Sequence, residues 1–229
     1  MFSRKNMISV IIPILNEEKI LEKTLSRLQP KLKNRELIIV DGGSTDDSIR
    51  IAEKYGKVIK SEQGRAKQLN AGAAAATGDI LIFLHADVWL EQGACKAVES
   101  ALLSGYVGGG FLQRIDGRSI LYRILEVTAD MRGKYLKVFY GDSGIFVKRT
   151  DFERIGGFPE VPIMEEMGFS KALRKLGKTK MVKPRIHISA RRWEANGIVR
   201  TTTINWLITF LYFLGFSLER LAKLYRNIR

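Results

Sequence analysis

The sequence predicts an α/β protein with a mostly parallel sheet flanked by helices. Two observations carry this prediction: short continuous apolar segments, and longer segments with an apolar residue at every third or fourth position. The first pattern is typical of strands buried on both faces, and the second of amphipathic helices. Because the two patterns alternate, right-handed crossovers should join the strands into a parallel sheet.

Four strands are predicted, at residues 8–14, 36–40, 58–60 and 80–84. Helices are predicted at residues 16–30, from a cap at residues 44–46 to residue 55, and at residues 65–76 and 93–103. Pro30 is expected to end the first helix, because a proline interrupts the helical hydrogen bonds. Thr77 and Gly78 are expected to close the third.

Composition indicates a globular chain. It has 229 residues, of which 45% are hydrophobic and 27% charged. Residues 1–195 are predicted to form one domain and residues 196–229 a helical tail.

Cys95 is the single cysteine, which excludes an internal disulfide framework and fits a reducing, cytoplasmic compartment. Its helical position favours a structural role. The first residues are polar and basic, so no signal peptide is expected.

The net charge of +14 indicates an anionic partner: a phosphorylated substrate, an anionic membrane or nucleic acid. Nucleic acid is the weakest of the three, because an RNA-binding sheet exposes aromatic residues among cations and these strands should be buried. We therefore expect no nucleic-acid partner.

A carboxylate, Asp87, lies just past the end of the predicted fourth strand, at the sheet edge where α/β folds bind ligands. An aspartate there suits Mg²⁺ or Mn²⁺ on a diphosphate, although it could simply cap the next helix. If the strands are neighbours, loops 13–18, 41–46 and 85–87 meet at one mouth. Asp41 could then accept hydrogen bonds from a base or ribose, and Arg65 and Lys67 could meet phosphate. Each also has an ordinary alternative as a turn, cap or solvated residue.

Several segments together resemble the family 2 glycosyltransferases, nucleotide-sugar enzymes of the GT-A fold. They are residues 10–17 (VIIPILNE), 39–47 (IVDGGSTDD), 64–72 (GRAKQLNAG), 77–87 (TGDILIFLHAD), 156–159 (GGFP), 164–166 (MEE) and 191–193 (RRW). The resemblance covers roughly residues 7 to 195. The His-Ala-Asp version, with GDSGIF at 141–146, is most similar to a bacterial subgroup.

The resemblance implies a set of site residues. Those for the nucleotide-sugar donor are Pro13, Asn16, Glu17, Asp41, Gly64, Arg65, Lys67, Asn70, His85 and Ala86. Asp87 matches the metal ligand of the Asp-x-Asp motif, and Arg191, Arg192 and Trp193 match the acceptor and diphosphate region. Glu166 matches the catalytic base, with Glu165 beside it, and either could take that role. The resemblance implies Mn²⁺ or Mg²⁺ as cofactor. His85 replaces a carboxylate, which favours Mn²⁺ somewhat.

Two further regions of the sequence, one basic and one apolar, also indicate possible partners. The segment from Met167 to Trp193 contains many lysines and arginines and no acidic residue, which indicates a solvated cationic face or a phosphate-binding one. Residues 204–216 are nearly all apolar but too short to span a bilayer, and residues 218–229 form an amphipathic pattern. The tail is therefore predicted either to lie on an anionic membrane, at the inner face of the cell membrane, or to be buried in a homo-oligomer contact or against the domain.

The sequence thus predicts a glycosyltransferase of the hexosyltransferase type, which moves a sugar from a UDP- or GDP-linked donor to an acceptor hydroxyl, with inversion. A lipid-linked acceptor would fit the apolar tail. The alternatives are a nucleotidyltransferase that makes nucleotide sugars and a non-catalytic nucleotide-sugar binder. The first should carry a glycine-rich loop after the first strand, where this chain has Pro13-Ile-Leu-Asn16-Glu17.

Overall fold

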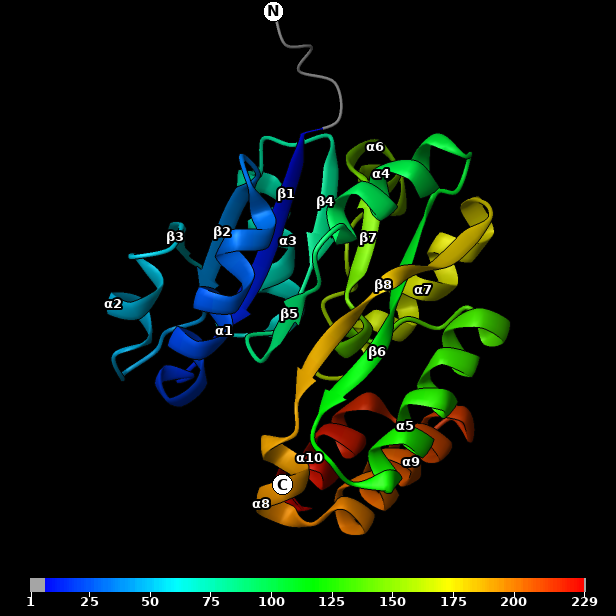
Figure 1. The fold of residues 1–229 in the computed structure, drawn as a ribbon. Helices are drawn as coiled ribbons and strands as arrows, with labels where there is room; N and C mark the ends of the chain where they lie inside the picture. The colour runs from blue at the N-terminus through cyan, green and yellow to red at the C-terminus, as the bar shows by residue number, and fades with distance from the viewer. Residues whose placement is uncertain (1–6, 229) are drawn as a thin grey trace, which may run out of the picture.

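The computed structural model describes residues 7–228, and side chains as far as residue 225. An eight-stranded sheet runs through the molecule in the order β3-β2-β1-β4-β7-β6-β8-β5, with helices on both faces (Figure 1). The strands are β1 Ile8–Ile14, β2 Glu36–Asp41, β3 Lys57–Lys60, β4 Ile80–Phe83, β5 Val88–Leu90, β6 Gly108–Asp116, β7 Ile145–Lys148 and β8 Thr179–Ser189.

The helices lie between these strands and after them. In chain order they are α1 Glu18–Leu32, α2 Ser48–Ala52, α3 Arg65–Ala75, α4 Ala94–Leu103, α5 Ile120–Met131, α6 Arg149–Ile155, α7 Glu165–Leu176, α8 Arg191–Asn196, α9 Ile198–Phe213 and α10 Leu218–Ile228. A π-helical turn, η1 Arg132–Leu136, extends α5, and a 3₁₀ turn, η2 Gly141–Ser143, precedes β7. No helix among residues 7–228 is both long and apolar enough to cross a membrane.

The sheet confirms the predicted fold class and divides into two halves. In the first, β1 is parallel to both β2 and β4, and β2 is parallel to β3. In the second, β7 is antiparallel to β4 and β6, β5 is antiparallel to β8, and β6 and β8 are parallel. The parallel half is the one that the alternating sequence pattern predicts.

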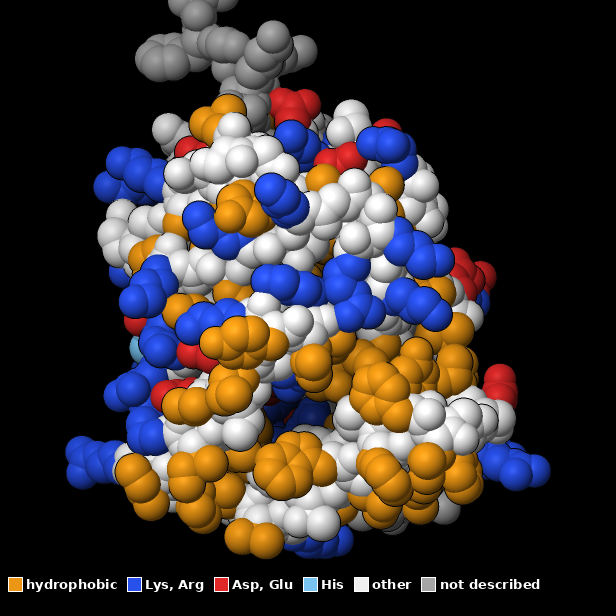
Figure 2. All heavy atoms as spheres, turned by 90° about the vertical axis from the view of Figure 1, so that its right-hand side faces the viewer, with side chains coloured by type: hydrophobic (Ala, Val, Ile, Leu, Met, Phe, Trp, Pro, Cys, Tyr) orange, Lys and Arg blue, Asp and Glu red, His pale blue; other side chains and the backbone are white. Residues whose placement is uncertain are grey.

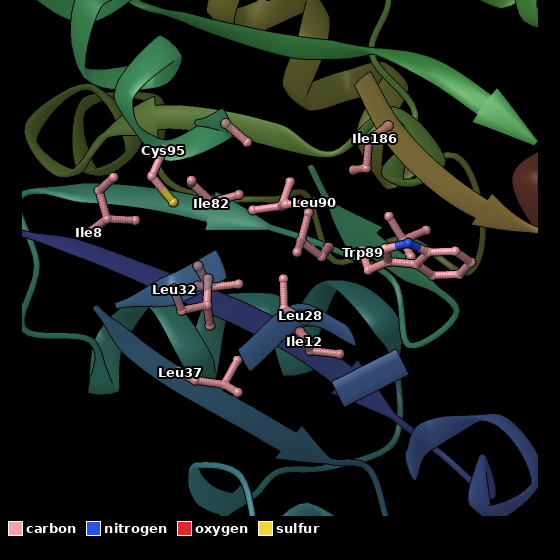
Figure 3. Close-up of a cluster of buried hydrophobic side chains, with 14 of the residues drawn as sticks. Ile8, Ile12, Leu28, Leu32, Leu37, Ile82, Trp89, Leu90, Cys95 and Ile186 are labelled. Atoms are coloured by element: carbon pink, nitrogen blue, oxygen red, sulfur yellow. The ribbon is translucent and has the colours of Figure 1, made fainter. Parts of the chain in front are cut away.

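Two hydrophobic clusters cover the two faces of the sheet. The residues of β1 alternate between them, because successive side chains of a strand point to opposite faces: Ile12 belongs to one cluster and Ile11 to the other. The first cluster contains residues of α1 and α4 (Figure 3), and the second contains residues of α3, α6 and α7. Cys95 lies in the first cluster, where burial raises the pKa of its thiol, as a structural cysteine should behave.

The predicted ends of the first two helices were wrong. Helix α1 continues through Pro30 to Leu32, because the proline lies in the last turn and removes only one hydrogen bond there. Helix α2 ends at Ala52, and the chain to Tyr55 forms a turn instead. The first strand was predicted at its exact bounds.

The tail packs on the rest of the protein. Ile208 of α9 and Leu221 and Ala222 of α10 are buried. The side of α10 that carries Leu221 and Ala222 therefore faces protein, while association of the tail with a membrane surface or a second copy stays a prediction. Burial within the chain removes the apolar surface of these side chains from water.

Candidate functional site

The loops after β1 and β2 meet at the carboxyl edge of the sheet. The backbone N–H of Thr45 donates to Oδ1 of Asn16 at 2.8 Å, and that of Glu17 donates to Oγ of Ser48 at 2.7 Å. Asn16 has a left-handed φ of 53°, which asparagine tolerates better than most residues. The predicted meeting of these loops is thus present in the structure.

Asp41 stabilises its own turn. Its buried carboxylate accepts hydrogen bonds from the backbone N–H groups of Gly43 at 2.9 Å and Ser44 at 3.1 Å. Beneath it, Nε2 of Gln68 donates to the carbonyls of Ile14 and Val40, at 2.8 and 2.9 Å, and so fixes the ends of β1 and β2 together. Sequence reasoning missed Gln68, and the contact of Asp41 with a base stays a prediction.

Arg191, the first residue of α8, connects the first loop to Asp87. Its guanidinium donates to Oε2 of Glu17 at 2.5 Å and lies 3.5 Å from Oδ2 of Asp87. Asp87 follows β4, separated from it by Leu84, His85 and the buried Ala86. A cation therefore already lies beside the carboxylate predicted to bind a metal.

Glu165 and Glu166 open helix α7. Both side chains are buried, and negative charge is favoured in the first turn of a helix, where backbone N–H groups point outward. Nη1 of Arg65 lies 3.4 Å from Oε1 of Glu165 and 3.5 Å from Oε1 of Glu166. Nε2 of His85 lies 3.5 Å from the same Glu166 oxygen. Met164, just before the pair, has a left-handed φ of 66°, a conformation that costs energy in a non-glycine residue.

The surroundings shift the pKa values of the two glutamates in opposite directions. Burial would raise the pKa of Glu166, but His85 and Arg65 outweigh it and hold this pKa below its usual range, at about 2. Burial and the neighbouring Glu166 charge raise the pKa of Glu165, and its Oε1 has no hydrogen-bond partner among the described residues. Glu166 is therefore ionised at neutral pH, as a proton acceptor must be, but its lowered pKa makes it a weaker base than Glu165.

His85 fits beside Glu166 because residue 141 is a glycine. A Cβ at Gly141 would lie 1.9 Å from Nε2 of His85. The GDSGIF segment was noted in the sequence, but its role in holding His85 could not be read from it. The predicted contacts of His85 with a ribose hydroxyl or Mn²⁺ stay predictions.

Asp87 and Glu166 line one pocket, together with Arg65, His85, Arg192 and Trp193. The structure thus brings these six predicted site residues together. The pocket continues between α5 and α9 and takes in residues that sequence reasoning missed, namely Gln113, Arg132, Tyr140, Asp142, Thr202 and Asn205. Nε of Arg132, Nε1 of Trp193 and Oγ1 of Thr202 are buried and lack a hydrogen-bond partner within the part of the chain that is described. Such atoms need a hydrogen-bond partner, which a polar ligand or water in the pocket could supply.

Other predicted donor residues lie outside the lining of this pocket. Both ends of the Asn70 amide bond the backbone of Phe158, each at 2.9 Å, which ties α3 to the loop before α7. Lys67 pairs with Glu62. Gly64, with φ 140°, precedes α3, and Pro13 pairs with Val40 within the sheet. Their roles in donor binding stay predictions.

A divalent ion fits the site only as a partner of the substrate. Among residues 7–228, no group of three or more histidine, cysteine, aspartate or glutamate side chains could hold a metal alone. Asp87 is partly exposed in the pocket and offers hard oxygen atoms. Mg²⁺ sites with one or two carboxylates and substrate phosphates have this donor set, so the residues fit an ion that bridges to a diphosphate.

Sequence comparison identifies proteins that are similar to this chain. The chain matches the family described as "Glycosyl transferase family 2" over residues 9–156, more than half of its length. Glycosyltransferase AglE of Haloferax volcanii is 34% identical over 184 residues, covering 69% of this chain and 58% of that protein. The glucosyl-3-phosphoglycerate synthase of Mycobacterium tuberculosis is 36% identical over 93 residues, 35% of this chain and 29% of the synthase. The matches span less than two thirds of either relative.

Solved structures share the fold. Mannosyltransferase PcManGT of Pyrobaculum calidifontis, in complex with GDP-Man and Mn²⁺, has a TM-score of 0.64 at 20% identity, covering 81% of this chain and 56% of that one. The mycobacterial synthase, in complex with Mn²⁺, UDP and glucosyl-3-phosphoglycerate, has a TM-score of 0.57 at 21% identity, covering 80% and 70%. At these identities the likeness establishes the GT-A fold alone.

Proposed function

Because the chain belongs to the family 2 glycosyltransferases, we propose that it transfers a sugar from a nucleoside diphosphate donor to an acceptor hydroxyl, with inversion. The observation that carries this proposal is that Asp87 and Glu166, from distant parts of the chain, line one pocket. Sugar transfer needs one group for the diphosphate and one base for the incoming alcohol, and these two carboxylates supply both.

The donor side is built on Asp87 and Arg191. Asp87 would hold Mn²⁺ or Mg²⁺ beside the diphosphate of the donor. Bound there, the ion supplies Lewis-acid stabilisation of the leaving diphosphate. Arg191, 3.5 Å from Asp87, can donate two parallel hydrogen bonds to phosphate oxygens. The solved relatives bind GDP-Man and UDP, which supports a GDP- or UDP-linked hexose as donor.

The acceptor side is built on Glu166. Its carboxylate accepts the proton of the acceptor hydroxyl while the hydroxyl oxygen bonds the anomeric carbon. The bond from that carbon to the diphosphate breaks on the opposite side, so the configuration inverts and the diphosphate leaves with the electron pair. Arg65 and His85 keep Glu166 ionised for this step. A general base of this kind contributes roughly 10²–10⁴-fold to the rate.

Release of nucleoside diphosphate from UDP- and GDP-hexoses, with water as the acceptor, tests the proposal. Glu166→Gln should lower the rate by about 10²–10⁴-fold and leave donor binding intact, measured as the rise of the melting midpoint with donor and Mn²⁺. Glu153→Gln, at an exposed site on α6, is the matched control. Donor binding without turnover in the wild-type protein would favour a non-catalytic binder. Full turnover in Glu166→Gln and in Glu165→Gln would remove the assigned base.

A further inference from the structure

Helix α5 has its polar side turned inward. Glu126 and Asp130 are buried on it: Oε1 of Glu126 accepts from the backbone N–H of Ile115 at 2.6 Å, and Oδ1 of Asp130 accepts from that of Gln113 at 2.9 Å. The acidic face of α5 thus holds strand β6.

The opposite side of α5 is apolar and faces outward. Its most exposed apolar residues recur at helical spacing, and they are Ile120, Ile124, Val127 and Met131. Val127 is 57% exposed. An ordinary surface helix exposes polar residues on its outward side, whereas α5 exposes apolar ones there and buries Tyr122 and Ala129 beside its two acidic residues. The exposed apolar stripe indicates a partner other than the protein's own core.

Helix α9 presents a second apolar stripe. Its most exposed members are Val199, Trp206, Phe210 and Phe213, and Trp206 is 60% exposed. Tyr135 and Leu136 of η1 are exposed as well. We call the α5 stripe, these two η1 residues and the α9 stripe together the docking surface. Figure 2 shows hydrophobic side chains gathered over the lower part of one face of the molecule, around a hollow.

A basic region adjoins the docking surface. Helix α7 exposes Lys171, Arg174 and Lys175, and Arg174 donates to the carbonyl of Leu136 in η1. Lys134 of η1 is exposed too. Figure 2 shows lysine and arginine side chains above the hydrophobic ones on the same face. A twofold dimer through the docking surface would bring two such basic regions near each other, at a cost in repulsion. An anionic lipid surface satisfies both the apolar and the basic residues.

The pocket that holds Glu166 opens at this surface. Leu125, Thr128 and Ala129 of α5 line it from one side, and Trp206 belongs both to its lining and to the α9 stripe. We propose that the docking surface seats the protein on an anionic lipid bilayer, with the mouth of the pocket against the membrane. If the sugar transfer proposed above holds, an amphiphilic alcohol would reach Glu166 directly from the bilayer.

Vesicle flotation of the full chain tests the docking without requiring turnover. Vesicles of phosphatidylglycerol and phosphatidylcholine should carry the protein, and vesicles of phosphatidylcholine alone should carry much less. Ile124→Gln/Val127→Gln should lower the partition coefficient by roughly tenfold or more. Leu103→Gln is the control, since this residue is 75% exposed on α4, outside the docking surface. It should float like the wild type.

A second readout checks that the docking surface enters the lipid. Brominated lipids should quench the fluorescence of Trp206, and Trp206→Phe should lose that part of the quenching. Equal flotation of the wild type and the Ile124→Gln/Val127→Gln variant would overturn the proposal. The proposal would also be overturned if neither protein floated and the wild type were a dimer that the same double substitution converts to a monomer. A second copy of the chain, and not a membrane, would then cover the docking surface. Donor hydrolysis by a protein that does not float would overturn the docking and leave the proposed function standing.

Discussion

Helices α1 and α5 have similar apolar periodicity but opposite orientations. Helix α1 buries Ile20, Leu21, Leu25 and Leu28 against the parallel half of the sheet. Helix α5 buries Glu126 and Asp130 and exposes its apolar stripe. The spacing of apolar residues therefore predicts that a helix forms, but the packing partner decides which side faces inward. Glu17, which pairs with Arg191 on the donor side, directly precedes α1, whereas α5 contributes Leu125, Thr128 and Ala129 to the wall of the pocket.

The largest effects on turnover are expected from substitutions of Asp87 on the donor side and Glu166 on the acceptor side. Asp87→Asn should weaken donor binding and turnover together, because it removes the carboxylate proposed to hold the metal and diphosphate. Glu166→Gln should lower turnover by about 10²–10⁴-fold with donor binding kept. Melting midpoints with donor and Mn²⁺, and rates of diphosphate release, give the two quantities. If both variants lost binding equally, the division into a donor and an acceptor side would be wrong.

Gly141→Ala should remove the contact between His85 and Glu166. A Cβ at this position would collide with Nε2 of His85, so the imidazole must move away from Glu166. We expect turnover to fall roughly tenfold, and His85→Ala to give a similar loss. The double variant should be no worse than either single one, because contacting residues are not additive. Additive losses measured in the same release assay would mean that Gly141 and His85 act separately.

The sequence predicted the parallel half of the sheet better than the rest of the pocket wall for a physical reason. Strand β1 and the Asp87 loop depend on local patterns, namely apolar runs and the polar residues that follow them. Strand β6 was missed because it begins with Gly108-Gly109-Gly110, which carry no side-chain pattern. A Cβ at Gly109 would lie 1.8 Å from the carbonyl oxygen of Lys180, so close strand pairing requires glycine there. Arg132 enters the pocket only through the packing of η1, which no local pattern encodes.

The pH dependence should identify the base within the acceptor side. A general base acts when deprotonated, so turnover falls as the pH drops through its pKa. The pKa of Glu166 is lowered from 4.5 to about 2, which places the acid limb of kcat/KM below pH 4.5. The pKa of Glu165 is raised, so an acid limb above pH 4.5 would assign the base to Glu165 instead. Circular dichroism over the same range must show the protein folded.

Asn70→Ala should have the smallest effect on catalysis and a clear effect on stability. The Asn70 amide joins α3 to the backbone of Phe158 through two hydrogen bonds, so its loss leaves two backbone groups without partners. We expect the free energy of unfolding to fall by about 1–3 kcal/mol, measured by urea denaturation. Asn196→Ala, at an exposed site in α8, is the matched control. The resemblance to the family instead places Asn70 at the donor. If Asn70→Ala left the free energy of unfolding unchanged and weakened donor binding, the result would support a role of Asn70 at the donor. It would also show that the hydrogen bonds between Asn70 and Phe158 do not stabilise the site.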